Sequence, residues 1–170
     1  VAFALSELFG LQLEKWDMAK LGQKSEHKFA GVQCGIMDQF ASIFGEAGKV
    51  LKLNCLSLTY ESISFNIQGY QLFLFNSNVP HALHESAYND RRNESAAALE
   101  LLKTKERSMA SFQDLNMAIL EQYASEIGDI GYRRARHVIT ENARVNQMCE
   151  AMANGRFAVA GQLLLESHLS

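Results

Sequence analysis

The sequence predicts an α+β fold, and three observations carry this prediction. Apolar residues recur at helical spacing through residues 1–44, patterns typical of β-strands occupy 49–75, and helical spacing returns after residue 85. The order of elements is therefore helices, three strands and then four helices. We expect the chain to cover parts of two domains.

The first part of the chain predicts three helices. Residues 1–9 form the first, which ends at Gly10, and residues 14–29 form the second. A loop flanked by Gly31 and Gly35 follows. The third helix is short and buried, because Ile36, Met37, Phe40, Ala41 and Phe44 recur at the helical period before Gly45.

Three strands are expected next, over residues 49–56, 62–67 and 70–75. In the second strand Ile63 and the apolar residues after it alternate with polar ones, as in a strand with one buried face. The third strand carries Leu72-Phe73-Leu74-Phe75 and is apolar on both faces. It should therefore be central in a sheet.

Four helices complete the chain, over residues 85–106, 112–127, 130–153 and 156–168. The domain boundary is expected at Gln68-Gly69, just before the third strand. Residues 1–68 and 69–170 would then belong to two different domains.

Composition excludes several classes of protein. The 170 residues are 48% hydrophobic and 21% charged, which is typical of a globular chain. Their 16 basic and 19 acidic residues give a net charge of −3, which argues against nucleic-acid binding. No apolar run approaches the roughly 20 residues that cross a membrane. Three cysteines, at 34, 55 and 149, suit a reducing cytoplasm and predict neither disulfides nor a zinc site.

The ends of the sequence have no ordinary start or stop. It opens on Val1 within an apolar run, without an initiator methionine, and the last helical pattern has no stop signal. Only one proline occurs in the chain. We expect an internal piece of a longer protein.

The stretch from Glu26 to Gln39 is the first candidate for chemistry. Glu26 lies on the second predicted helix, and Asp38 lies in the first turn of the third, where backbone N–H groups stabilise an anion. Gly31 and Gly35 allow a ligand to approach the backbone closely. Two such carboxylates could hold a metal ion and orient a hydroxyl. Alternatively, Asp38 only favours the helix start and Glu26 is solvated.

Two further polar stretches are candidates for ligand contacts. Asn76–His81 follows the third predicted strand, but its residues are also ordinary turn formers. Tyr88 shares a helix face with Arg91 and Arg92, which suits a sugar or a phosphate, or an ordinary polar surface. The basic run at 133–137 is interpreted as a salt-bridged helix face.

Three motifs resemble galactokinases, which are members of the GHMP family of small-molecule kinases. Residues 23–40, QKSEHKFAGVQCGIMDQF, resemble the central segment of these enzymes. Residues 76–92 are similar to their sugar-site strand and helix, and residues 134–142 to a later helix. The resemblance implies a GHMP-kinase-like two-domain fold. The chain would cover the end of the N-terminal domain and the first part of the C-terminal domain.

The resemblance also implies an activity and site residues. The activity is transfer of the ATP γ-phosphate to the anomeric hydroxyl of galactose, with Mg²⁺. Asp38 matches the catalytic aspartate, which also contacts the substrate, and Glu26 matches the carboxylate assigned to magnesium. Gly35, through its backbone, and Tyr88, through its side chain, match positions that line the sugar. Other family members suggest N-acetylgalactosamine or galacturonate as the substrate, or a non-catalytic sensor of galactose and ATP.

Two motifs of the family are absent from these 170 residues. They are the Arg-Thr-Glu-His-x-Asp motif, which supplies a catalytic arginine, and the serine- and glycine-rich loop that binds ATP. Such a loop cradles phosphate with backbone N–H groups. We therefore expect no kinase activity from the 170 residues alone, and no ATP-binding residue among them. The implied partners are galactose and the missing segments of the same protein.

Overall fold

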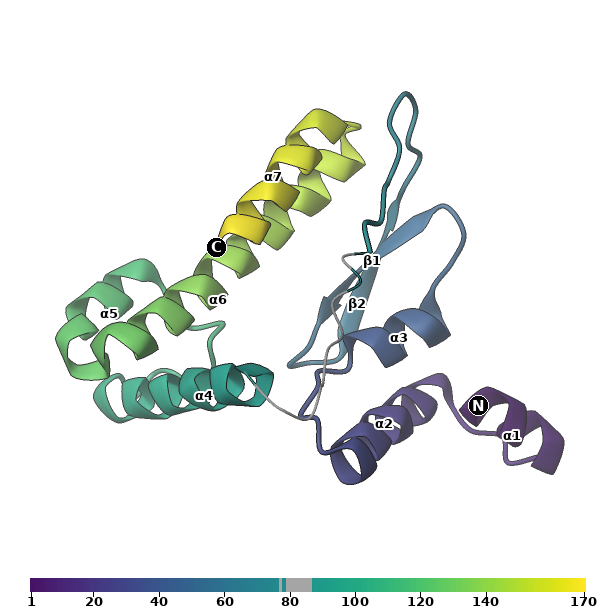
Figure 1. Ribbon diagram of the computed structural model, residues 1–170, viewed down its shortest axis with the longest axis horizontal. Helices are drawn as coiled ribbons and strands as arrows, with labels where there is room; N and C mark the ends of the chain where they lie inside the picture. Colours follow the sequence, from purple (N-terminus) through teal and green to yellow (C-terminus); the bar gives the residue numbers. More distant parts are fainter. Residues whose placement is uncertain (77, 79–86) are drawn as a thin grey trace. The chain divides into compact units, whose positions relative to one another are not determined.

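The structure is a computed structural model that describes residues 1–76, 78 and 87–170. The chain divides into two compact units, Val1–His84 and Glu85–Ser170. The first unit contains helices and a β-hairpin, and the second is helical (Figure 1). Within the described ranges, no helix is both long and apolar enough to span a membrane. The α+β prediction is confirmed, and the domain boundary at residue 68 stays a prediction.

The first unit begins with the three predicted helices. They are α1 (Ala2–Phe9), α2 (Lys15–Ser25) and α3 (Met37–Phe44). The second predicted helix continues past α2 as a π-helical turn, η1 (Glu26–Ala30). The predictions for these helices are therefore confirmed, except that the last turn of the second is wider than an α-helix.

An aromatic cluster holds α2, α3 and the hairpin together. The Trp16 ring of α2 lies 5.3 Å from the Phe40 ring of α3 and 4.8 Å from that of Phe44. Tyr60 meets the same two phenylalanine rings edge-on, at 5.2 and 5.3 Å. Phe40 is 2% exposed. Aromatic pairs at these separations add to the gain from burial, so they fix which face of α3 is turned inward.

The hairpin consists of β1 (Lys49–Asn54) and β2 (Thr59–Ser64) in antiparallel register. At its turn, the Asn54 side chain accepts hydrogen bonds from the N–H groups of Leu56 and Ser57. Both strands were predicted. The second begins at Thr59, three residues before the predicted start at residue 62, because the turn at Asn54 reverses the chain there.

The prediction of a central strand at 70–75 is wrong. These residues are not in a strand, and the Leu74 and Phe75 side chains are almost wholly exposed. An apolar segment becomes a central strand only where strands on both sides accept its backbone hydrogen bonds. In the part of the chain that the structure describes, the one sheet is the β1–β2 hairpin, and it does not include this segment.

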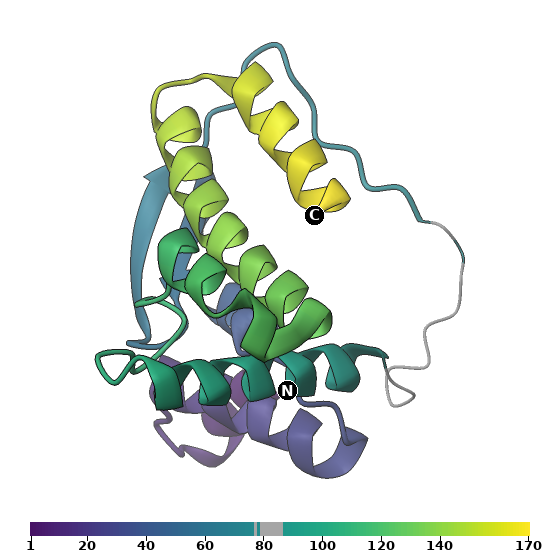
Figure 2. The same ribbon diagram turned by 90° about the vertical axis from the view of Figure 1, so that its left-hand side faces the viewer.

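The second unit is built around one long helix, α6 (Ala124–Ala153). Helices α4 (Ala87–Lys105) and α5 (Met117–Gln122) pack against its first half, and α7 (Phe157–Leu169) runs back along its second half (Figure 2). The larger buried cluster comprises Leu102, Met109, Leu115, Leu120 and Ala135, and the smaller one Ala151, Ala160 and Leu163. These helices confirm the predictions for 130–153 and 156–168, and for the described part of 85–106.

The predicted helix 112–127 is wrong in its first part. The Asp114 carboxylate accepts hydrogen bonds from the N–H groups of Ala110 and Ser111, both at 2.9 Å. These bonds hold the pKa of Asp114 below its ordinary value, and they compete with helix formation. The helix therefore begins only after Asn116, whose side chain accepts from the Ile119 N–H.

Candidate functional site

The loop between η1 and α3 presents backbone and carboxylate groups at one place in the first unit. Val32 and Ile36 are buried and anchor the loop at both ends. Gly35 lies between them on the exposed side. A Cβ atom added at Gly35 would meet no other atom within 4 Å, and its φ lies outside the left-handed region. Neither crowding nor backbone strain within the described chain explains this glycine, so the space beside it is open to a ligand.

Asp38 lies in the first turn of α3 on its exposed side. Successive residues of a helix are turned by about 100°, so Asp38 points roughly opposite to the buried Phe40. The aromatic cluster that orients Phe40 therefore also turns the Asp38 carboxylate outward. Gly35 and Asp38 lie at one loop–helix junction, and Asp38 is in the first turn of its helix, as predicted.

Glu26 is exposed and begins the π-helical turn η1. Such turns are frequent at functional sites. No group of three or more His, Cys, Asp or Glu side chains that could hold a metal ion occurs among the described residues. A metal at Glu26 would therefore need ligands from other sources, such as phosphate oxygens and water.

Two side chains that the sequence analysis did not single out contact the loop. Gln23 Nε2 donates a hydrogen bond to the Cys34 carbonyl oxygen at 3.2 Å, and His27 Nε2 lies 2.8 Å from the same oxygen. A carbonyl oxygen can only accept, so Nε2 of His27 carries the proton. The signal in the sequence was the spacing of four residues between two polar side chains, just before a glycine-flanked loop.

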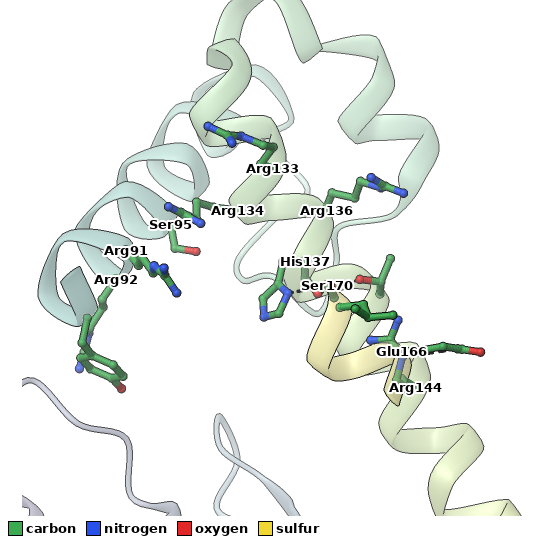
Figure 3. Close-up of a pocket in the computed structure, with 13 residues that line it drawn as sticks. Arg91, Arg92, Ser95, Arg133, Arg134, Arg136, His137, Arg144, Glu166 and Ser170 are labelled. Carbon is green, nitrogen blue, oxygen red and sulfur yellow. Dashed lines mark hydrogen bonds and ion pairs between the residues drawn. The ribbon is translucent and has the colours of Figure 1, made fainter. Parts of the chain in front are cut away.

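Tyr88 lies in the other unit, near the start of α4, and its side chain is half exposed. It lines a pocket of about 1020 Å³ that is formed by α4, α6 and the end of α7 (Figure 3). The lining is strongly basic: one glutamate faces six arginines, namely Arg91, Arg92, Arg133, Arg134, Arg136 and Arg144. A phenol among guanidinium groups suits a polar or anionic ligand.

Ion pairs around this pocket join the helices of the second unit. Arg134 of α6 donates to Glu94 of α4 at 2.7 Å, and Arg144 pairs with Glu141 on the same helix. Arg144 also lies 3.8 Å from Glu166 of α7. The interpretation of 133–137 as a salt-bridged face is confirmed for Arg134, whose partner Glu94 lies on α4.

The candidate stretch Asn76–His81 falls mainly outside the described residues. Within its described part, the Asn78 N–H donates to the Asn76 side-chain oxygen at 2.8 Å. This is a local turn of the kind that asparagine favours. Cys55 is exposed, while Cys34 and Cys149 are partly buried; none of the three forms a disulfide.

The chain is similar to known galactokinases over its whole length. It is 38% identical to the galactokinase of Thermotoga maritima over 169 residues, which are 99% of this chain and 46% of that protein. It is 37% identical to the galactokinase of Lactococcus lactis subsp. cremoris, covering 100% of this chain and 43% of the relative. The chain thus spans about half the length of the curated relatives that it matches.

Two further comparisons agree. Residues 1–46 match the sequence profile described as GHMP kinases N terminal domain. The crystal structure of Lactococcus lactis galactokinase complexed with galactose matches 98% of this chain with a TM-score of 0.90 at 35% identity, and 43% of that chain is covered. The resemblance drawn from the three motifs is confirmed, and the fold is that of the matching part of this galactokinase.

Proposed function

We propose that this chain is the part of a galactokinase that contains the catalytic aspartate. The reaction is transfer of the ATP γ-phosphate to the anomeric hydroxyl of galactose. The observation that carries the proposal is the similarity to galactokinases along 99% of the chain, together with the exposed Gly35–Asp38 junction at its most specific motif. We also propose Tyr88 as a substrate-binding residue.

Asp38 has the catalytic role in this proposal. Phosphoryl transfer depends mainly on positioning and on stabilisation of charge. A carboxylate aimed at the attacking hydroxyl supplies both, because it fixes the oxygen and accepts its proton as the bond to phosphorus forms. The outward orientation of Asp38, set by Phe40 on the opposite face of α3, supports this role.

Magnesium and ATP complete the proposal. Magnesium is usually bound by one or two carboxylates together with phosphate oxygens and water. A single exposed carboxylate at Glu26 fits that pattern, so Glu26 would hold the ion, which neutralises phosphate charge when bound.

We also propose a cytoplasmic location, because an odd number of cysteines suits a reducing compartment.

Replacement of Asp38 distinguishes an enzyme from a sensor that only binds galactose and ATP. In the protein at its full natural length, we expect Asp38→Ala to lower galactose-dependent ADP production by about 10²- to 10⁴-fold. Galactose binding, measured by calorimetry, should be largely kept. Asp17→Ala is the matched control, since Asp17 is also an exposed acid in the first turn of a helix.

Two results would contradict the proposal. One is a wild-type protein that binds galactose but produces no ADP in response to it, which indicates a sensor. The other is an Asp38→Ala variant that turns over galactose as fast as the Asp17→Ala control. N-acetylgalactosamine and galacturonate belong in the same assay, because a higher kcat/KM for either sugar would identify a sibling kinase.

A further inference from the structure

The Cys34 carbonyl oxygen receives two side-chain hydrogen bonds from one side. Gln23 and His27 are four residues apart on the continuous helical path of α2 and η1, and their Nε2 atoms lie 3.2 and 2.8 Å from this oxygen. A loop carbonyl needs only one donor to be satisfied. Two donors from the same helix face restrict its direction as well.

The direction of this carbonyl determines the direction of the next N–H group. The Cys34 carbonyl and the Gly35 N–H belong to one planar peptide unit, which is trans, as are all peptide bonds of the described chain. In a trans unit the oxygen and the hydrogen point to opposite sides. Because the oxygen is held towards Gln23 and His27, the Gly35 N–H is aimed away from their helix.

The Gly35 N–H is available to a ligand. This N–H has no acceptor among the residues that the structure describes, and the space beside Gly35 is open. Asp38 is exposed three residues further along the chain. A sugar hydroxyl that accepts from this N–H would therefore lie at the same junction as the carboxylate.

We propose that Gln23 and His27 are positioning residues that lock the Cys34–Gly35 peptide, so that its N–H donates to a hydroxyl of the sugar. This inference rests on the proposed function, because it takes a sugar as the ligand. Neither side chain touches the reacting atoms. His27 makes the shorter of the two hydrogen bonds and is expected to have the larger effect.

The test compares variants of the protein at its full natural length. We expect His27→Ala to raise the KM for galactose roughly tenfold, since small misplacements of binding groups are costly, while the KM for ATP stays unchanged. His27→Gln should restore most of the loss, because the glutamine Nε2 can donate from nearly the same place. Gln23→Ala should have a smaller effect in the same direction. The control is Lys24→Ala, an exposed neighbour on α2 that should change nothing.

The NMR order parameter of the Gly35 N–H provides a readout that does not depend on activity. The order parameter should be lower in His27→Ala and Gln23→Ala than in the wild type and in Lys24→Ala, because the peptide is then less restricted. An unchanged order parameter in both variants would overturn the proposal. The proposal would also be overturned if His27→Gln were as impaired as His27→Ala. An equal rise of the KM values for galactose and ATP in His27→Ala would overturn it as well.

The two proposals fail in different ways. A wild-type protein that phosphorylates no sugar overturns the proposed function and removes sugar as the ligand of the Gly35 N–H. In that case the order parameter of the Gly35 N–H still decides whether Gln23 and His27 hold the peptide. A wild-type protein that phosphorylates galactose, with no effect of either substitution, overturns only the positioning role.

Discussion

Gly35 and Asp38 are both exposed, and the proposed site uses them in different ways. Asp38 would supply a carboxylate at the start of α3, whereas Gly35 would supply a backbone N–H without a side chain beside it. Nothing in the described chain would clash with a methyl group at Gly35. We therefore propose that glycine stands here because a ligand approaches the backbone closely.

Gly35→Ala separates binding from stability. A methyl group would crowd a sugar hydroxyl against the Gly35 N–H, so we expect the KM for galactose to rise roughly tenfold, the loss of about one hydrogen bond. The free energy of unfolding should stay equal or rise by about 0.4–1 kcal/mol, because alanine restricts the unfolded chain. Steady-state kinetics and urea unfolding measure the two effects. A clear loss of stability with unchanged KM would show that Gly35 is needed for folding instead.

Site residues differ in how far the sequence reveals them. Asp38, Gly35 and Glu26 were predicted because they lie in a continuous motif beside glycines and a helix start. Gln23 and His27 lie in the same motif, but their contact with the Cys34 carbonyl depends on the path of the loop. A polar residue on a helix has many possible partners, and its spacing alone does not select one.

At the scale of elements, two glycines inside helices have opposite roles. Gly128 has φ 68° and ψ 170°, so it produces the kink within α6. This conformation is open almost only to glycine. Gly161 lies in the interior of α7, without a left-handed φ and with no atom within 4 Å of an added Cβ. Alanine should therefore destabilise the fold at Gly128 and stabilise it at Gly161.

We expect Gly128→Ala to lower the free energy of unfolding by about 1–3 kcal/mol, the cost of forcing a side chain into this backbone conformation. Gly161→Ala, the matched control, should raise it by about 0.5–1 kcal/mol, because alanine is the better helix former. Urea unfolding of the two variants gives the comparison. Equal effects of the two substitutions would mean that the kink at Gly128 is absent in solution.

The elements that were predicted correctly are those determined by local pattern. Buried aromatic residues at helical spacing predicted α3, and the glycines after α1 and α3 marked their ends. The break between the two predicted helices around residue 128 coincides with the kink in α6. Two predictions were wrong, for different reasons. The helix expected from residue 112 starts later, because hydrogen bonds to Asp114 replace its first turn. Residues 70–75 have the composition of a strand, but the sheet in the described chain does not include them.

At the scale of the whole molecule, residues 70–75 form a concentrated apolar surface. Leu72, Phe73, Leu74 and Phe75 are all more than two thirds exposed, and the rings of Phe73 and Phe75 lie 6.4 Å apart. Contiguous exposed apolar side chains promote association. A segment of this composition outside a sheet can also add to the edge of another sheet.

The 170-residue polypeptide should therefore self-associate as its concentration rises. We expect the double variant Leu74→Lys/Phe75→Lys to shift it towards the monomer, as measured by analytical ultracentrifugation. Asn93→Lys/Asn146→Lys is the control, since it adds the same charge at two exposed positions in helices. Equal shifts in the two double variants would attribute the effect to charge alone and contradict a role for the apolar segment.

We propose that the protein phosphorylates galactose with Asp38 as the catalytic group. This reaction can be followed by ³¹P NMR of the protein at its full natural length with galactose and MgATP. We predict a new phosphate ester signal coupled to the anomeric proton of the sugar, with matching loss of the ATP γ-phosphate signal, and neither change with Asp38→Ala. Binding of galactose without any phosphate ester would contradict the claim and identify the protein as a sensor of the sugar.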